Sequence, residues 1–77
     1  SLISEMSKYH PQDAIKLIRK YLDKDDSYIV QAEMIKQLGN HGDASDIDRI
    51  KRYVEPWSPR KIMRIAANKS LTQLQEK

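Results

Sequence analysis

At 77 residues, the chain is about the smallest size at which one hydrophobic core gives a net stability of a few kcal/mol without a disulfide or a metal. It has no cysteine, which excludes disulfides, thiolate metal sites and a cysteine nucleophile. Its formal charge of +3, from 14 Lys and Arg against 11 Asp and Glu, is only a weak indication of nucleic-acid binding, because mixed charges are also typical of a solvated helical surface.

Hydropathy gives no indication of a membrane partner. No apolar run approaches the roughly 18 residues that a transmembrane helix needs. No basic start followed by a short apolar stretch marks a signal peptide. We therefore expect a soluble segment.

The first predicted helix spans about 11–23. Pro11 suits the first helical turn, where a missing N–H costs little. Apolar residues then recur at spacings of three and four, which places them on one arc. The residues predicted to face the core are Ala14, Leu17, Ile18, Tyr21 and Leu22. Lys16, Arg19 and Lys20 fall on the opposite arc, which is expected to face solvent.

A second helix is expected over about 27–39. Three side chains that accept hydrogen bonds from free N–H groups precede it: Asp25, Asp26 and Ser27. Its apolar residues cover more than half of the circumference: Tyr28, Val30, Ala32, Met34, Ile35 and Leu38. Such a helix must be covered on two sides, which is typical of an inner helix in a stack. Residues that favour positive φ are expected to end it: Gly39, Asn40 and Gly42.

The third and fourth helices are predicted from their caps. Asp43 is a candidate N-cap, with Asp46 at the spacing of a capping box. The third helix should stop near Tyr53, because Pro56 disfavours helical geometry at the residue before it, Glu55. Its apolar residues are Ile47, Ile50 and Val54. The fourth helix, about 59–75, starts from an N-cap followed by proline, Ser58 and Pro59. It is expected to bury Met63, Ala67, Leu71 and Leu74.

The chain repeats itself at an offset of 33 residues. The matching pairs are Asp13 and Asp46, Lys16 and Arg49, Leu17 and Ile50, Arg19 and Arg52, Lys36 and Lys69, and Leu38 and Leu71. A period of this length indicates stacked helical hairpins, because one hairpin cannot bury its apolar faces alone. The sequence therefore predicts an all-α fold, an α-solenoid of two antiparallel helical hairpins.

Two segments, 30–39 and 63–71, resemble the Val-Arg-x-Ala-Ala-x-x-Ala-Leu-Gly line of HEAT repeats. This armadillo-like resemblance implies repeat units over 11–39 and 43–75, each with an outer helix followed by an inner one. Glu33 and Gln37 stand where the family prefers alanine, which indicates an irregular array. The resemblance implies a fold more than a function, since HEAT arrays serve as scaffolds, transport receptors, chromatin subunits and appendages to enzymes.

Residues 1–8 are expected to be the end of a truncated preceding repeat. Counting back 33 residues from 37–39 lands on 4–6, so Leu2, Ile3 and Met6 look like the last turn of an inner helix. Because stable solenoids need about three or more units, an isolated fragment is expected to be marginal or to self-associate through its uncapped ends.

The segment 26–33 also resembles repeats at the C-terminal end of some gluzincin-type zinc aminopeptidases. In such enzymes the helical domain closes over the active-site chamber and does not cleave the bond. The catalytic His-Glu-x-x-His motif of that family is absent here, so no catalytic or zinc-binding residue can be carried over.

No catalytic, cofactor-binding or metal site is predicted. The two histidines, His10 and His41, have no second ligand at the spacing of a helical metal site. No glycine-rich phosphate loop is present, and no spacing assembles a nucleophile with its base. We therefore expect a segment that is not itself an enzyme, whether or not its full-length parent is a metallopeptidase.

The candidate interaction surface consists of Lys16, Arg19, Lys20, Arg49, Arg52 and Trp57. Stacking the repeats would line four of these cations into ladders that could follow a phosphate backbone. The alternative is that Asp13 pairs with Lys16 and Asp46 with Arg49 within their own helices, which would damp the ladders. Trp57 is expected to fill a gap between units, or else to lie at an interface.

Gln31 and Arg64 are expected to be structural residues between repeats, because each lies within the apolar arc of its inner helix. Together these observations favour a non-catalytic packing or scaffold segment. Its partner would be the remainder of its parent chain or another protein. A protein- or nucleic-acid-binding module that uses the cationic face remains the alternative.

Overall fold

A computed structural model of the chain describes residues 2–25, 27–54 and 61–76. Helices make up most of this part of the chain: α1 (Leu2–Tyr9), α2 (Pro11–Tyr21), α3 (Tyr28–His41), α4 (Ile47–Lys51) and α5 (Lys61–Gln75), with the short 3-10 helices η1 (Leu22–Lys24) and η2 (Ala44–Asp46). The described residues contain no strand, so the predicted all-α class is confirmed.

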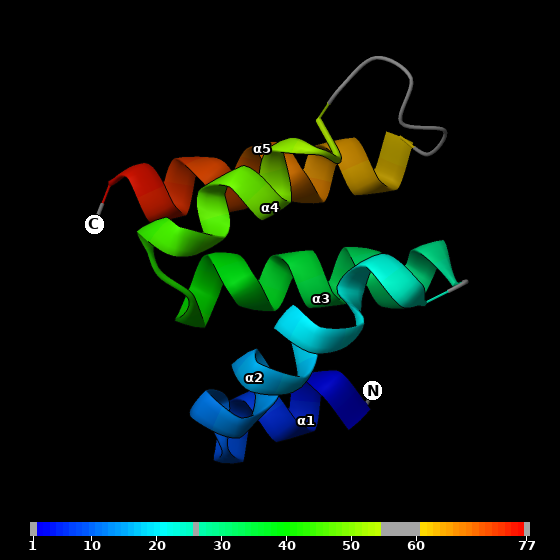
Figure 1. The fold of residues 1–77 in the computed structure, drawn as a ribbon, viewed down its shortest axis with the longest axis vertical. Coiled ribbons are helices and arrows are strands. Elements are labelled where there is room, and N and C mark those ends of the chain that lie inside the picture. Colours follow the sequence, from blue (N-terminus) through cyan, green and yellow to red (C-terminus); the bar gives the residue numbers. More distant parts are fainter. Residues whose placement is uncertain (1, 26, 55–60, 77) are drawn as a thin grey trace.

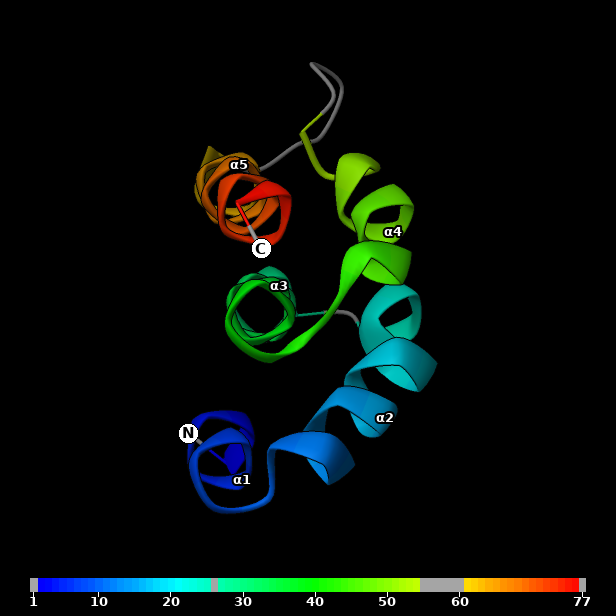
Figure 2. The same cartoon turned by 90° about the vertical axis from the view of Figure 1, so that its left-hand side faces the viewer.

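The helices are arranged in two layers. Figure 2 shows α1, α3 and α5 in one layer and α2 and α4 in the other. The three helices of the first layer run in the same direction, and α2 and α4 run back (Figure 1). Helix α3 contacts α1, α2 and α5, with the most extensive packing against α5. The broad apolar surface of α3 is therefore covered from several sides.

The core lies between the two layers and along α3. It is made of the buried side chains of Ile15, Ile18, Leu22, Ala32, Met34, Ile35, Leu38, Ile50, Met63, Ala67 and Leu74. The burial predicted for Met63, Ala67 and Leu74 is confirmed, and Leu71 is partly buried against the same cluster.

The face of α2 that points to the core differs from the prediction at two positions. Ala14, Ile18 and Leu22 are buried as expected, but Leu17 and Tyr21 are 36% and 41% exposed. Ile15, which the spacing left aside, is buried instead. The apolar residues of this helix form a broad arc, and contacts with α1 and α3 decide which of them face the core.

Several predicted helix starts are confirmed. Pro11 is the first residue of α2, and the Ser27 hydroxyl accepts a hydrogen bond from the Val30 N–H at 3.3 Å. Asp43 and Asp46 form the predicted capping box at the start of η2. These caps satisfy N–H groups that have no partner inside the helix.

The predicted end of the second helix is wrong. Helix α3 continues through Gly39 and Asn40 to His41, and none of the described residues has positive φ. Gly42, with φ of −80°, donates its N–H to the Leu38 carbonyl oxygen at 2.8 Å. Gly39 has a different role, because it lies buried where α5 crosses α3.

A Cβ atom added at Gly39 would lie 2.7 Å from the Ser70 Cβ and 2.6 Å from its hydroxyl oxygen. That hydroxyl donates to the Ile35 carbonyl oxygen at 2.8 Å, deep between the helices. The missing side chain at position 39 therefore lets α5 approach α3 closely.

Some expectations fall outside the described residues: those for Asp26, Glu55, Pro56, Trp57, Ser58 and Pro59.

Gly39→Ala is expected to destabilise the fold by about 1–3 kcal/mol, because the added methyl overpacks the contact with Ser70. Alanine alone would favour the helix by about 1 kcal/mol, so a loss of stability would report the tertiary contact. Urea unfolding monitored by circular dichroism measures the change. Lys69→Ala, at an exposed site of α5, is the control and should stay within about 0.5 kcal/mol. A Gly39→Ala variant more stable than the parent would contradict this role.

Candidate interaction surfaces

The Asp46 carboxylate joins α2 and α4, the two helices of the second layer, which we call the outer layer; α1, α3 and α5 form the inner layer. It accepts hydrogen bonds from Arg19 of α2 at 2.9 Å and from Arg49 of α4 at 2.8 Å. It also accepts from the Asp43 N–H at 3.0 Å, as part of the capping box. The Asp46 side chain is fully buried, while those of Arg19 and Arg49 are 33% and 30% exposed.

The environment of Asp46 keeps it ionised. Burial alone would raise its pKa, because it disfavours the charged form. Hydrogen bonds from Arg19 and from the Asp43 N–H, together with the charges of Arg19 and Arg49, outweigh burial and lower the pKa below its ordinary value. Asp46 is thus a buried anion held by two arginines, which is a structural arrangement.

A second polar contact joins the same two segments at their other end. Arg52 donates to Asp23 at 2.7 Å, and the Tyr53 hydroxyl donates to the same carboxylate at 2.5 Å. Burial of the Tyr53 ring, and then this hydrogen bond, raise the pKa of its hydroxyl well above the ordinary value. The Tyr53 hydroxyl is therefore engaged with Asp23.

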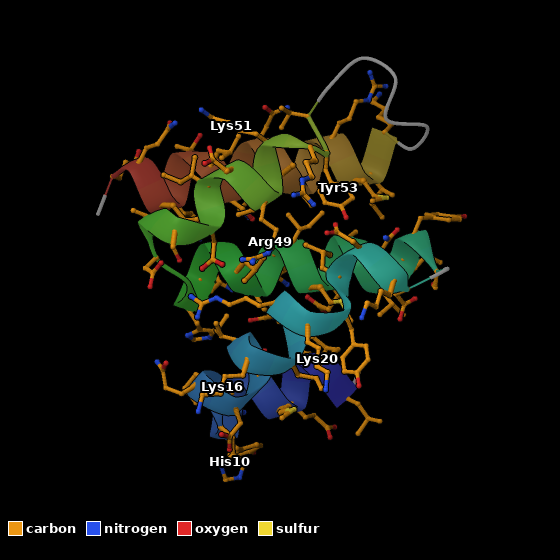
Figure 3. All side chains as sticks on the ribbon, viewed as in Figure 1. His10, Lys16, Lys20, Arg49, Lys51 and Tyr53 are labelled. Atoms are coloured by element: carbon orange, nitrogen blue, oxygen red, sulfur yellow. The ribbon has the colours of Figure 1, made fainter. Side chains whose placement is uncertain are left out.

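These contacts pair three arginines of the predicted cationic ladders with aspartates. The pairing expected between Asp46 and Arg49 is present, whereas no ion pair joins Asp13 to Lys16 in the described part of the chain. Arg19, Arg49 and Arg52 all point to aspartates. Figure 3 shows Lys16, Lys20 and Lys51 on the outer helices, and the Lys20 ammonium lies 5.4 Å from the ring centroid of Tyr21. No ion pair joins these three lysines to a carboxylate of the described residues, and Trp57 lies outside that part of the chain.

Gln31 and Arg64 have different surroundings. The Gln31 side-chain amide donates to the Leu22 carbonyl oxygen at 2.9 Å, which joins α3 to η1. The Arg64 Nε is buried and has no hydrogen-bond partner among residues 2–25, 27–54 and 61–76. Between α3 and α5, the polar link at the surface is Gln73 donating to Asn40 at 2.9 Å.

A large apolar groove lies between α1 and α3. Its volume is about 850 Å³, within the range of ligand pockets. We call it the first groove; its lining residues are Leu2, Ile3, Glu5, Met6, Tyr9, His10, Leu17, Asp25, Ile29, Val30, Glu33 and Met34. Helix α3 packs less extensively against α1, which has eight residues, than against α5, which has 15.

A smaller second groove of about 320 Å³ lies between α3 and α5. It shares Ile29 and Glu33 with the first, and its other lining residues are Ala32, Lys36, Ile62, Ile65, Ala66, Lys69, Ser70 and Gln73. We call the surface formed by both grooves the inner face. Ile29 and Ile65 are 60% and 57% exposed there. Single exposed apolar residues are common on protein surfaces, whereas apolar residues gathered in one patch indicate an interaction site.

The inner face was not predicted from the sequence. Ile29, Ile62 and Ile65 are visible in the printed sequence as apolar residues without an assigned core position. These isoleucines lie on predicted helices but outside the predicted core faces. Their presence there could have indicated an exposed apolar surface.

Metal and membrane signals are equally sparse. Among the described residues, no three His, Asp or Glu side chains come together to hold a metal ion. None of the described helices has the length and hydropathy to cross a membrane.

Comparison of the chain with protein-family models, with curated proteins and with solved structures finds no match.

Asp46→Asn is expected to cost about 2–3 kcal/mol of stability at neutral pH, because it removes charge-assisted hydrogen bonds and leaves two arginines without their carboxylate. Since the folded-state pKa of Asp46 lies below its unfolded value, the ionised carboxylate stabilises the parent at neutral pH. This contribution is lost as the pH falls below about 4 and through the folded-state pKa. Urea midpoints measured from pH 7 to pH 2 should therefore fall less in Asp46→Asn than in the parent. Parallel curves would contradict the role of Asp46.

Duplex DNA is expected to bind weakly, because the three arginines of the ladders are engaged with aspartates. A fluorescence titration at several salt concentrations measures this, since each phosphate contact adds about 0.9 to the slope of log K against log salt. We expect a slope below about 3. A steeper slope that Lys16→Glu, Lys20→Glu and Lys51→Glu together abolish would instead favour a nucleic-acid interface.

Proposed function

We propose that this chain is a non-catalytic helical-repeat segment that acts by packing its inner face against other protein. The observation that carries the proposal is the apolar exposure of this face, where two adjoining grooves meet at Ile29. The occupant is the remainder of the parent chain or a separate protein partner.

The arrangement of the helices supports this role. The 33-residue offset relates Lys36 on α3 to Lys69 on α5, and these two helices run in the same direction (Figure 1). A HEAT-like array of two hairpins, preceded by α1, accounts for this relation. Stacked arrays of this kind bind partners along an extended inner surface. The first specific context that we propose is the helical C-terminal domain of a zinc aminopeptidase-like enzyme.

The energetics also favour coverage by protein. Burying an isoleucine side chain completely is worth about 1.5–3 kcal/mol. Ile29 and Ile65 each keep more than half of their surface exposed, so covering both would contribute roughly 2–3 kcal/mol. A phosphate backbone gains nothing from such a surface, whereas an apolar protein surface does.

Introduced cysteines test the proposal, because the chain has no native cysteine. Ile65→Cys reports on the inner face, and Lys51→Cys is the control on the outer layer. Maleimide labelling rates are compared between the isolated chain and the full-length protein purified from its natural source, each carrying the same substitution. Labelling at position 65 is expected to be at least about tenfold slower in the natural protein, with position 51 unchanged. Equal rates at position 65 would contradict the proposal.

A further inference from the structure

The first groove carries a charge opposite to that of the whole chain. Among the described residues, its lining includes three carboxylates, Glu5, Asp25 and Glu33, and no Lys or Arg. The chain as a whole has a net charge of +3. The second groove differs, because Lys36 and Lys69 line it together with Glu33. The negative charge of the inner face is therefore concentrated at the first groove.

We infer that the first groove binds an amphipathic helix that carries lysine or arginine beside an apolar stripe. This inference rests on the proposed interaction role of the inner face and names the chemistry of the partner. Apolar anchors of such a helix would enter between α1 and α3, and its cations would lie beside the three carboxylates. Anionic partners such as fatty acids, nucleic acids and acidic peptides are disfavoured at this groove by the same charges.

The carboxylates are placed to meet cations. Glu5 is exposed on α1 and Glu33 is half-buried on α3, so they lie on the two helices that border the groove. Glu33 accepts one hydrogen bond from the Gln37 side chain at 3.3 Å through Oε2. Asp25 accepts from the Ser27 N–H at 2.8 Å through Oδ1. Each carboxylate has two oxygens and several lone pairs, so acceptor capacity remains for a partner's lysine or arginine.

The apolar lining suits a helix of variable sequence. Two of the three methionines of the chain, Met6 and Met34, line the first groove; Met34 also belongs to the core, as does Met63. Methionine side chains are flexible and polarisable, and they adapt to different apolar partners. Helix α1 has eight residues and is about 12 Å long. Anchors at positions i, i+4 and i+7 span about 10 Å, so roughly two turns of a partner helix fill the groove.

Synthetic peptides of about 14 residues test the inference, because they form roughly four helical turns. The first peptide has a leucine stripe at i, i+3, i+4 and i+7 with lysine elsewhere. The second replaces every lysine by glutamate, and the third has the lysine composition with the leucines scrambled. Isothermal titration calorimetry with the 77-residue chain should detect binding of the first peptide alone.

Glu5→Gln with Glu33→Gln is expected to weaken binding of the lysine peptide about tenfold, because each exposed ion pair contributes modestly. The matched control is Asp48→Asn with Glu76→Gln, which changes the net charge equally at exposed sites outside the groove. The control should bind like the parent. Circular dichroism of all variants checks that the fold is retained.

Equal binding of the glutamate peptide, equal binding of the scrambled peptide, or equal weakening by the control variant would each overturn the inference. So would the absence of binding by the lysine peptide. None of these results bears on the cysteine-labelling experiment, which reports whether the inner face is covered at all. Protection of position 65 without lysine-peptide binding would keep the packing role and reject this partner.

Discussion

Because Gly39 has no side chain, α5 lies close enough to α3 for the Ser70 hydroxyl to donate to the Ile35 carbonyl oxygen. The remaining packing depends on this contact. It covers one side of a helix that is apolar over most of its circumference, and it brings Met63, Ala67 and Leu74 against the core. The other side of α3 receives α1 and α2 less closely, which leaves the first groove open. One tight contact and one loose contact on the same helix thus produce both the core and the inner face.

The outer layer is joined by charge where the inner layer is joined by apolar packing. Arg19 reaches from α2 to Asp46, and Arg52 reaches from beyond α4 back to Asp23. Arg19 and Arg52 are 33 residues apart in the sequence, and their carboxylate partners lie 27 and 29 residues away along the chain. Cations that look like a ladder in the sequence therefore serve as links between neighbouring segments. This leaves the inner face, with its exposed isoleucines, as the surface more suited to binding.

Local features of the fold were predictable, and distances between helices were not. Pro11, Ser27 and the pair Asp43 and Asp46 act through neighbours a few residues away, so their capping roles could be derived from spacing. The prediction that Gly39 ends the helix was wrong, because a glycine that ends a helix and a glycine that admits a neighbouring helix look identical in a sequence. The aspartate at position 46 was recognised as a cap, but its link to Arg19 spans 27 residues and depends on tertiary packing. The first groove depends on the separation of α1 and α3, for which the repeat offset carries no information.

The loose packing of α1 has a consequence for the order in which parts of the molecule open. Segments with few buried contacts open locally at a lower free energy than the global transition. Helix α1 has one buried residue, Ser7, while α3 has six. Exchange of backbone amides would therefore be faster in α1 than in the paired helices α3 and α5. A partner bound in the first groove would contact α1 and α3 together. By mass action, a higher concentration of this partner would therefore make local opening of α1 less frequent.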